Sequence, residues 1–239
     1  MTTQPLHPPP AGFAAGRDAA HRLAVYVISP ARRRATERIG LRTSPGGFTT
    51  PPYGDDERVR LDVDRIVRER AGAADSLPVT TLNAAAAFVL GGPPDAEWAE
   101  GFDVPPLGDP DEPLALDAAS GAFLGAWYAF AFDVLGVLRE ETAANDPNEI
   151  QLWPEHFDAA FDAEAPGGRI TFGASPGDGT SDEPYLYVLP PVAVPRDEVW
   201  NAVGFPGAVL PLSGFVDAAD QRGAALAFMR GRHAAVASP

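Results

Sequence analysis

The side chains best suited to chemistry lie together in one segment, Leu152-Trp153-Pro154-Glu155-His156-Phe157-Asp158, which Asp162 soon follows. If Glu155 to Asp162 forms a β-strand, His156, Asp158 and Asp162 project from the same face, because successive side chains alternate. Neighbours in that row are about 7 Å apart, so His156 and Asp158 could meet. Asp158 could then orient His156 as a general base, or the pair could supply two ligands to a divalent metal.

These residues also have a purely structural interpretation. The alternation from Glu155 to Asp162 is typical of a strand with one buried face, and its solvent-facing row is expected to be polar. Trp153, Glu155 and Tyr185 could line a ligand pocket beside His156, although aromatic residues more commonly pack in the core. The candidate site is therefore His156 and Asp158 as catalytic residues, with Trp153, Glu155 and Tyr185 as pocket residues.

A second acidic group occupies the segment Gly177-Asp178-Gly179-Thr180-Ser181-Asp182-Glu183. Oxygen ligands on a glycine-containing loop suit a hard cation such as calcium. The segment lacks the spacing and terminal Glu of a helix-loop-helix calcium site, so a solvated hairpin loop is favoured. We assign no metal ligands and no cofactor to the chain.

Two β regions are expected to position these residues. In the first, Ser44-Pro45-Gly46-Gly47 supplies turn-forming residues between two short strands, and strict alternation follows from Arg58 to Asp64. In the second, Glu164 to Gly168 forms the turn. The expected strands are Ile39–Thr43, Phe48–Thr50, Arg58–Asp64, Leu77–Leu82, Glu155–Asp162, Arg169–Ala174 and Tyr185–Leu189.

Four helices are expected around these strands. The expected ranges are Phe13–Glu37, Asn83–Leu90, Ala118–Ala143 and Val216–Val236. The first helix is expected to be kinked or split at Pro30, and Asp117 and Asp217 are expected to cap the last two. The third is apolar on most sides, but Asp133 interrupts it and small residues are frequent. A buried core helix is therefore favoured over a membrane span.

These elements predict an α+β fold, in which an antiparallel sheet packs on the long buried helix and the terminal helices. The sheet could comprise two related hairpin-rich halves, since Ser44-Pro45-Gly46-Gly47 and Ser175-Pro176-Gly177-Asp178 occupy roughly comparable places, although coincidence explains so short a match equally well. We expect a disordered tail over residues 1–12 and a single domain over 13–238. A proline-rich and acidic loop is expected at about 93–113.

Composition limits the classes of partner and chemistry. The formal charge is −15, from 33 acidic and 18 basic residues, and every basic residue is Arg. Such a chain is not expected to bind nucleic acid or anionic membranes. The absence of Cys excludes disulfides, thiolate metal sites and cysteine nucleophiles.

Further motifs are missing. The sequence has no nucleotide-binding glycine motif, phosphate loop, nucleophile elbow or histidine pair at metal-ligand spacing. The start, Met1 to Gly12, is polar and proline-rich, unlike a signal peptide, so we expect a cytoplasmic protein.

Three segments carry a resemblance. Trp153-Pro154-Glu155-His156-Phe157-Asp158, Gly173-Ala174-Ser175-Pro176-Gly177-Asp178 and Pro184-Tyr185-Leu186-Tyr187-Val188 resemble a pattern shared by uncharacterised hypothetical proteins of actinobacteria. The resemblance covers about the second half of the chain. It implies a bacterial cytoplasmic protein and says nothing about a substrate.

Two functional hypotheses remain. The favoured one is a soluble binding or interaction protein, whose partner is a small molecule or another protein, because the sequence holds no complete catalytic constellation. The alternative is a small-molecule enzyme, which a metal could assist, with His156 as base or ligand and Asp158 as its orienting partner. Whether the chain is an enzyme stays open at this point.

Overall fold

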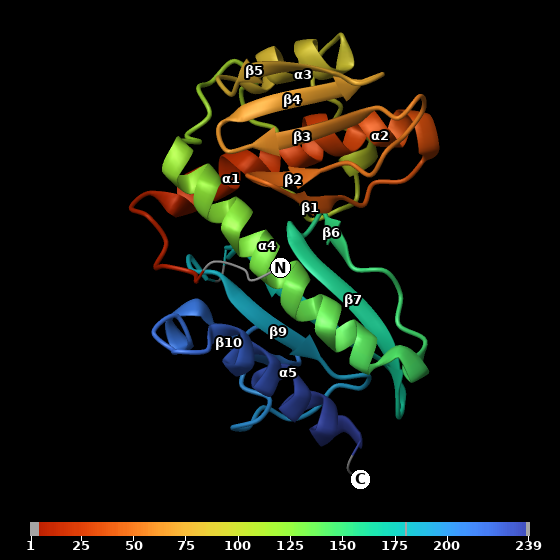
Figure 1. Cartoon of the computed structure of the whole chain (residues 1–239), viewed down its shortest axis with the longest axis vertical. Helices are drawn as coiled ribbons and strands as arrows, with labels where there is room; N and C mark the ends of the chain where they lie inside the picture. The colour runs from red at the N-terminus through yellow and green to blue at the C-terminus, as the bar shows by residue number, and fades with distance from the viewer. Residues whose placement is uncertain (1–4, 180, 238–239) are drawn as a thin grey trace. The chain divides into compact units, whose positions relative to one another are not determined.

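The structure is a computed structural model that describes residues 5–179 and 181–237 (Figure 1). Within these residues the strands form two five-stranded antiparallel sheets, which are accompanied by α-helices. The predicted α+β class is therefore confirmed.

The chain divides into two compact units, which are described separately. The N-terminal unit comprises Pro9–Tyr128 and Leu152–Phe157, and the C-terminal unit comprises Met1–Pro8, Ala129–Gln151 and Asp158–Pro239. The division falls inside the long helix and inside the segment that carries the candidate site. The single domain expected over residues 13–238 stays a prediction.

The N-terminal unit begins with one continuous helical segment. Helix α1 (Phe13–Leu23) passes through a π-helical turn, Ala24–Ile28, into α2 (Ser29–Thr36). Pro30 lies in the first turn of α2, directly after the π-helical turn. The regular α-helical hydrogen bonds are already interrupted there, so the missing N–H of proline is tolerated. The predicted interruption near Pro30 thus takes the form of a π turn.

The first sheet contains the strands in the order β1-β2-β3-β4-β5. Their bounds are β1 Arg42–Ser44, β2 Gly47–Thr49, β3 Arg58–Asp62, β4 Arg65–Arg70 and β5 Ala73–Pro78. The hairpin at Ser44 to Gly47 is confirmed. The strand expected over Leu77–Leu82 coincides with β5 only at Leu77 and Pro78. It ends early because helix α3 (Leu82–Leu90) follows, and the Thr81 hydroxyl caps this helix by accepting the Ala84 N–H.

Helix α4 (Ala118–Glu141) begins where the sequence predicts, with Asp117 Oδ1 accepting the Ser120 N–H at 2.7 Å. Two of its glycines lie against the first sheet. A Cβ at Gly125 would be 2.6 Å from the carbonyl carbon of Gly46, and one at Gly121 would overlap the Val63 carbonyl. The helix thus packs directly on the backbone of two hairpin turns.

In the described part of the chain, α4 alone is long and apolar enough to cross a membrane. Most of that apolar stretch is buried inside the structure, including Trp127, Tyr128 and Leu135. This burial supports the prediction of a core helix.

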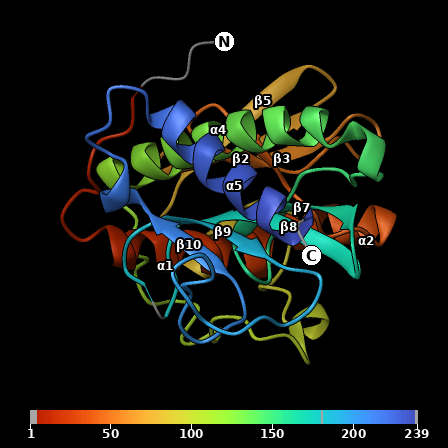
Figure 2. The same ribbon diagram turned by 90° about the horizontal axis from the view of Figure 1, so that it is seen from below.

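The second sheet has the order β10-β9-β8-β7-β6. Its strands are β6 Gln151–Trp153, β7 Asp158–Ala165, β8 Gly168–Ser175, β9 Tyr185–Leu189 and β10 Ala208–Pro211. Helix α5 (Gln221–Ala237) contacts β9 and β10 (Figure 2). Its predicted start at Val216 is wrong, because Asp220, not Asp217, caps it by accepting the Gly223 N–H at 2.8 Å.

The two sheets share a feature that the sequence only suggested. In both, strands that are consecutive in the chain are neighbours in the sheet. The two proline-containing turns do not correspond, however: Ser44 to Gly47 joins the first two strands of its sheet, whereas Ser175 to Asp178 follows β8. The matching turn sequences therefore give no support to a duplication.

Part of the expected N-terminal tail is held in place. Residues 1–4 lie outside the described residues, but Leu6 is buried. Its N–H donates to Gln221 Oε1 at 2.8 Å and its carbonyl accepts from Gln221 Nε2 at 2.9 Å. Gln221 thus pairs with both backbone groups of Leu6. The chain is therefore ordered at Leu6, where the sequence predicts a disordered tail.

The expected loop at about 93–113 is largely irregular, with a single turn of 3₁₀ helix at Glu97–Ala99. Trp98 anchors it, because its side chain is buried and its indole N–H donates to the Val25 carbonyl at 2.9 Å.

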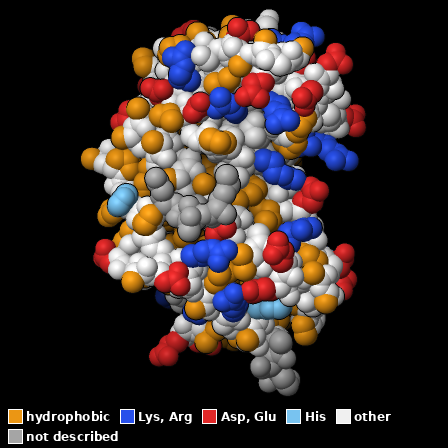
Figure 3. Space-filling view, in the orientation of Figure 1, with side chains coloured by type: hydrophobic (Ala, Val, Ile, Leu, Met, Phe, Trp, Pro, Cys, Tyr) orange, Lys and Arg blue, Asp and Glu red, His pale blue; other side chains and the backbone are white. Residues whose placement is uncertain are grey.

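Charged side chains of both signs are interspersed on the face seen in Figure 3. Several are paired across strands: Arg60 contacts Glu69 at 3.0 Å, and Arg68 contacts Glu57 at 3.4 Å. The arginine run near the end of α2 is likewise used structurally, since Arg32 donates to the Gly40 carbonyl at 2.6 Å.

Candidate functional site

The segment that carries the candidate residues is a hairpin and not one strand. β6 ends at Trp153, Pro154 to Phe157 form a turn, and β7 begins at Asp158. Phe157 has a left-handed φ of 55°, which is strained for a bulky residue, and its N–H donates to the Trp153 carbonyl at 2.7 Å. The strand predicted over Glu155–Asp162 therefore begins only at Asp158, and His156 belongs to the turn.

Two side chains from distant helices anchor this turn within the N-terminal unit. The Tyr128 hydroxyl donates to the Phe157 carbonyl at 2.8 Å. The His21 ring stacks on the Phe157 ring with centroids 4.7 Å apart, and His21 Nε2 lies 2.9 Å from the Pro154 carbonyl. Phe48 packs edge-on against Phe157 at 5.5 Å. These contacts explain how the strained conformation of Phe157 is maintained.

Burial fixes the protonation state of His21. It lowers the pKa of the imidazole from 6.5 to about 4, and the hydrogen bond to the Pro154 carbonyl only partly opposes this shift. His21 is thus neutral near pH 7, and we assign the ring proton to Nε2 because a carbonyl can only accept. No sequence pattern signals this contact, which joins positions 133 residues apart.

The predicted site residues in the turn and beside it have different environments. Trp153 is half-buried and His156 is exposed. Glu155 is buried, and its Oε2 has no hydrogen-bond partner among the described residues. A buried acceptor without a donor is rare in folded proteins.

Asp158 belongs to the C-terminal unit, where it is buried at the start of β7. Its Oδ2 accepts a hydrogen bond from the hydroxyl of Tyr187 on β9. The strand between them, β8, presents Gly173, which pairs with Tyr187 in the sheet. A Cβ at Gly173 would overlap the Tyr187 ring, so only glycine lets this ring cross β8 towards Asp158.

A second phenol and carboxylate pair lies beside the first. The Tyr185 hydroxyl donates to Asp178 Oδ2, and Asp178 Oδ1 accepts the Ser181 N–H at 3.1 Å. The Tyr185 and Tyr187 ring centroids are 6.2 Å apart. Because the Asp158 carboxylate also raises the pKa of Tyr185, the structure brings these two predicted site residues together.

Both phenols are held in their protonated forms. Burial and the hydrogen bond to Asp178 raise the pKa of Tyr185. Burial also raises the pKa of Tyr187, with the negative charge of Asp158 adding to the effect. These hydroxyls therefore act as hydrogen-bond donors at neutral pH and cannot serve as bases.

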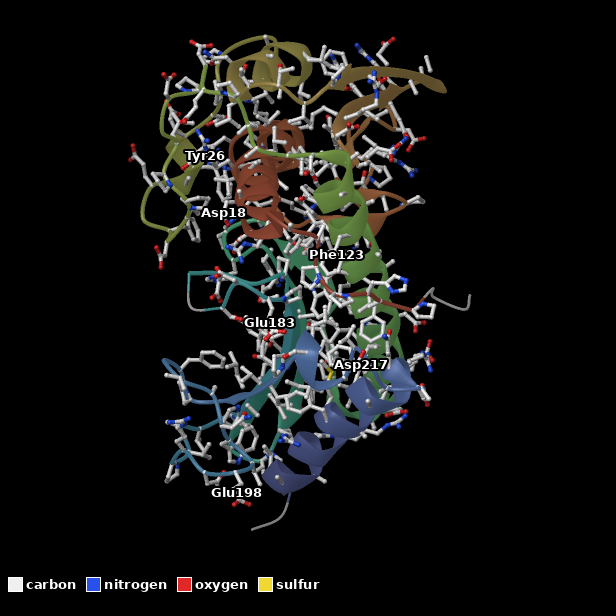
Figure 4. All side chains as sticks on the ribbon, turned by 90° about the vertical axis from the view of Figure 1, so that its left-hand side faces the viewer. Asp18, Tyr26, Phe123, Glu183, Glu198 and Asp217 are labelled. Carbon is white, nitrogen blue, oxygen red and sulfur yellow. The ribbon has the colours of Figure 1, made fainter. Side chains whose placement is uncertain are left out.

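In the acidic loop that could have suited calcium, Asp178 and Glu183 accept hydrogen bonds from protein donors. Beside the bonds to Asp178, the Glu183 carboxylate accepts the Ser213 N–H at 2.9 Å and the Ser213 hydroxyl at 3.0 Å. Figure 4 labels Glu183. The described residues contain no group of three or more His, Asp or Glu side chains that could hold a metal ion.

No family model, no curated protein and no solved structure matches the chain.

Proposed function

We propose that this chain is a binding protein of the bacterial cytoplasm, which holds a small molecule or a partner protein without transforming it. The residues that would make the contact are Asp158, Tyr185 and Tyr187 of the second sheet and Asp178 of the loop between β8 and β9. We refer to them as the phenol–carboxylate cluster.

The observation that carries the proposal is the pairing of each carboxylate with a phenol of raised pKa. The two hydrogen bonds hold these groups in fixed positions, and phenol and carboxylate oxygens can accept further hydrogen bonds, which suits recognition of a ligand that carries donors. General acid–base catalysis works best with a group whose pKa is near the operating pH, and neither phenol meets that condition.

The alternative, a small-molecule enzyme built on His156 and Asp158, has weaker support. His156 is exposed on the turn, and Asp158 Oδ2 already accepts a hydrogen bond from Tyr187. An orienting partner for a catalytic histidine would need that carboxylate to accept from the imidazole.

The location and the class of partner rest on the sequence. The formal charge of −15 and the interspersed acidic side chains in Figure 3 disfavour nucleic acid and anionic lipid as partners. The actinobacterial origin rests on the resemblance of the three segments.

The test is a thermal-midpoint screen of common metabolites and divalent metals on the wild type, Tyr187→Phe, Tyr53→Phe and His156→Ala. A bound ligand at 100 times its dissociation constant stabilises the folded state by about 2.7 kcal/mol. We expect a metabolite to raise the midpoints of the wild type, His156→Ala and Tyr53→Phe, and to raise that of Tyr187→Phe much less. Tyr53→Phe is the matched control, since it removes a hydroxyl from the other unit.

Turnover of a metabolite that is abolished by His156→Ala would contradict a pure binding role and favour the enzyme. A response that Tyr187→Phe retains in full would remove the cluster from the binding site.

A further inference from the structure

The buried carboxylate of Glu155 stands out because one of its two oxygens is unpaired in the part of the chain that the structure describes. The residue is 8% exposed, and its Oε2 has no hydrogen-bond donor among the described residues. Leaving an acceptor buried and unpaired destabilises a fold, and the effect is larger for a charged group. The fold alone therefore gives no reason for a carboxylate at this position.

The backbone of the turn that carries this carboxylate is held in a fixed position. The Tyr128 hydroxyl and the His21 ring each bond to a turn carbonyl, and the rings of His21, Phe48 and Tyr128 pack around Phe157. The strained φ of Phe157 is retained within this packing. A rigid backbone that presents one unpaired acceptor is an arrangement suited to a ligand with a donor.

We propose that Glu155 binds the ammonium group of a small organic amine through Oε2. A buried carboxylate is best compensated by a positively charged donor, because a charge-assisted hydrogen bond is stronger than a neutral one. A single unpaired oxygen needs one N–H donor, which an ammonium group supplies. A divalent metal fits less well, since the described residues provide no group of three ligands.

This inference uses a different side chain from those of the phenol–carboxylate cluster, and it is tested with a different probe and different variants. The two proposals can therefore fail separately. Tyr187→Phe is expected to leave the response to an amine unchanged.

The experiment measures the thermal midpoint of the full chain in methylammonium chloride and in sodium chloride of equal ionic strength. The variants are Glu155→Met, which replaces the carboxylate by an apolar chain of similar length, and Glu112→Met, an exposed control in the same unit. We expect methylammonium to raise the midpoints of the wild type and Glu112→Met above their values in sodium chloride. That rise should be lost in Glu155→Met.

The salt-matched midpoints of the variants give a second readout. If the carboxylate is present for a ligand and not for the fold, Glu155→Met should melt about 2 °C or more above the wild type. A lower midpoint for Glu155→Met would show a structural role and overturn the proposal. Equal midpoints of the wild type in the two salts would overturn it as well. If Glu155→Met does not fold, Glu155→Gln keeps the shape without the charge and should lose the response to methylammonium.

Discussion

At the scale of single residues, burial decides what the ionisable groups of this protein can do. His21 resembles a catalytic imidazole in type only. Its ring stacks on Phe157, donates to a backbone carbonyl and has a pKa lowered to about 4 by burial. The same physical cause raises the pKa of Tyr185 and Tyr187. In each case burial stabilises the neutral form, so at neutral pH these residues act through hydrogen bonds and not through charge.

The pKa of His21 predicts how the free energy of unfolding depends on pH. The unfolded-state pKa of 6.5 lies above the folded-state value of about 4, so the unfolded chain binds the proton first as the pH falls. The stability is therefore complete above pH 6.5 and declines as the pH falls to about 4, by at most about 3 kcal/mol. Urea unfolding of the wild type and His21→Gln across this range measures the difference.

His21→Gln keeps a side-chain N–H for the Pro154 carbonyl but cannot be protonated, so its pH dependence should be shallower than that of the wild type. The exposed His156→Gln is the control and should follow the wild type. Identical slopes for wild type and His21→Gln would show that His21 is not the group responsible.

At the scale of elements, the contact between α4 and the first sheet depends on glycines in the helix. Gly125 lies against the backbone of Gly46 and Gly47, and Gly121 lies against Val63. Glycine lowers the stability of a helix by about 1 kcal/mol relative to alanine, so its presence there reflects the close approach. At the third glycine of the helix, Gly136, an added Cβ would meet no described atom within 4 Å.

Alanine substitutions in α4 should therefore change the free energy of unfolding in opposite directions. Gly125→Ala would force the hairpin backbone to move and should destabilise the fold by about 1–3 kcal/mol. Gly136→Ala, the matched control, should stabilise it by about 0.5–1 kcal/mol through helix propensity. Chemical denaturation measures both. Equal and favourable effects would mean that the helix does not pack closely on the hairpin.

Elements with a clear hydrophobic period can be predicted from the sequence, and others cannot. The long helix and β3 have such a period, and the strand Tyr185–Leu189 has the bounds that the sequence predicts. The sequence does not predict β4, because Ile66 and Val67 are its only apolar residues and show no alternation. Its charged residues include Arg68 and Glu69, which form ion pairs with charges on neighbouring positions. Pairing with other strands, which is a tertiary effect, makes it a strand.

The candidate site shows the same limit. Alternation between Glu155 and Asp162 is equally compatible with a strand and with a turn followed by a strand, so the predicted position of His156 is wrong, while Asp158 lies on a strand as expected. The partners of the site residues, Tyr187, Asp178 and His21, cannot be inferred from the sequence, because they come from elements far away along the chain.

At the scale of the whole molecule, α4 is common to the two compact units. Residues up to Tyr128 belong to the N-terminal unit and residues from Ala129 to the C-terminal unit. Each part of the helix contributes buried side chains, such as Leu124 and Trp127 in the first and Val134 and Leu138 in the second. Neither unit can lose its part of α4 without exposing apolar surface and fraying the helix that the other unit needs.

This sharing predicts that the chain unfolds in one cooperative transition, as a single domain over residues 13–238 would. Calorimetry should give an unfolding enthalpy equal to the van't Hoff enthalpy, and Gly125→Ala should lower the whole transition without splitting it. Probes in the two units provide an independent check, since Trp98 belongs to the N-terminal unit and Trp200 to the C-terminal unit. Fluorescence of variants that each retain one of these tryptophans should report the same midpoint. Two separate transitions would instead show that the units fold independently and that α4 can be divided between them at little energetic cost.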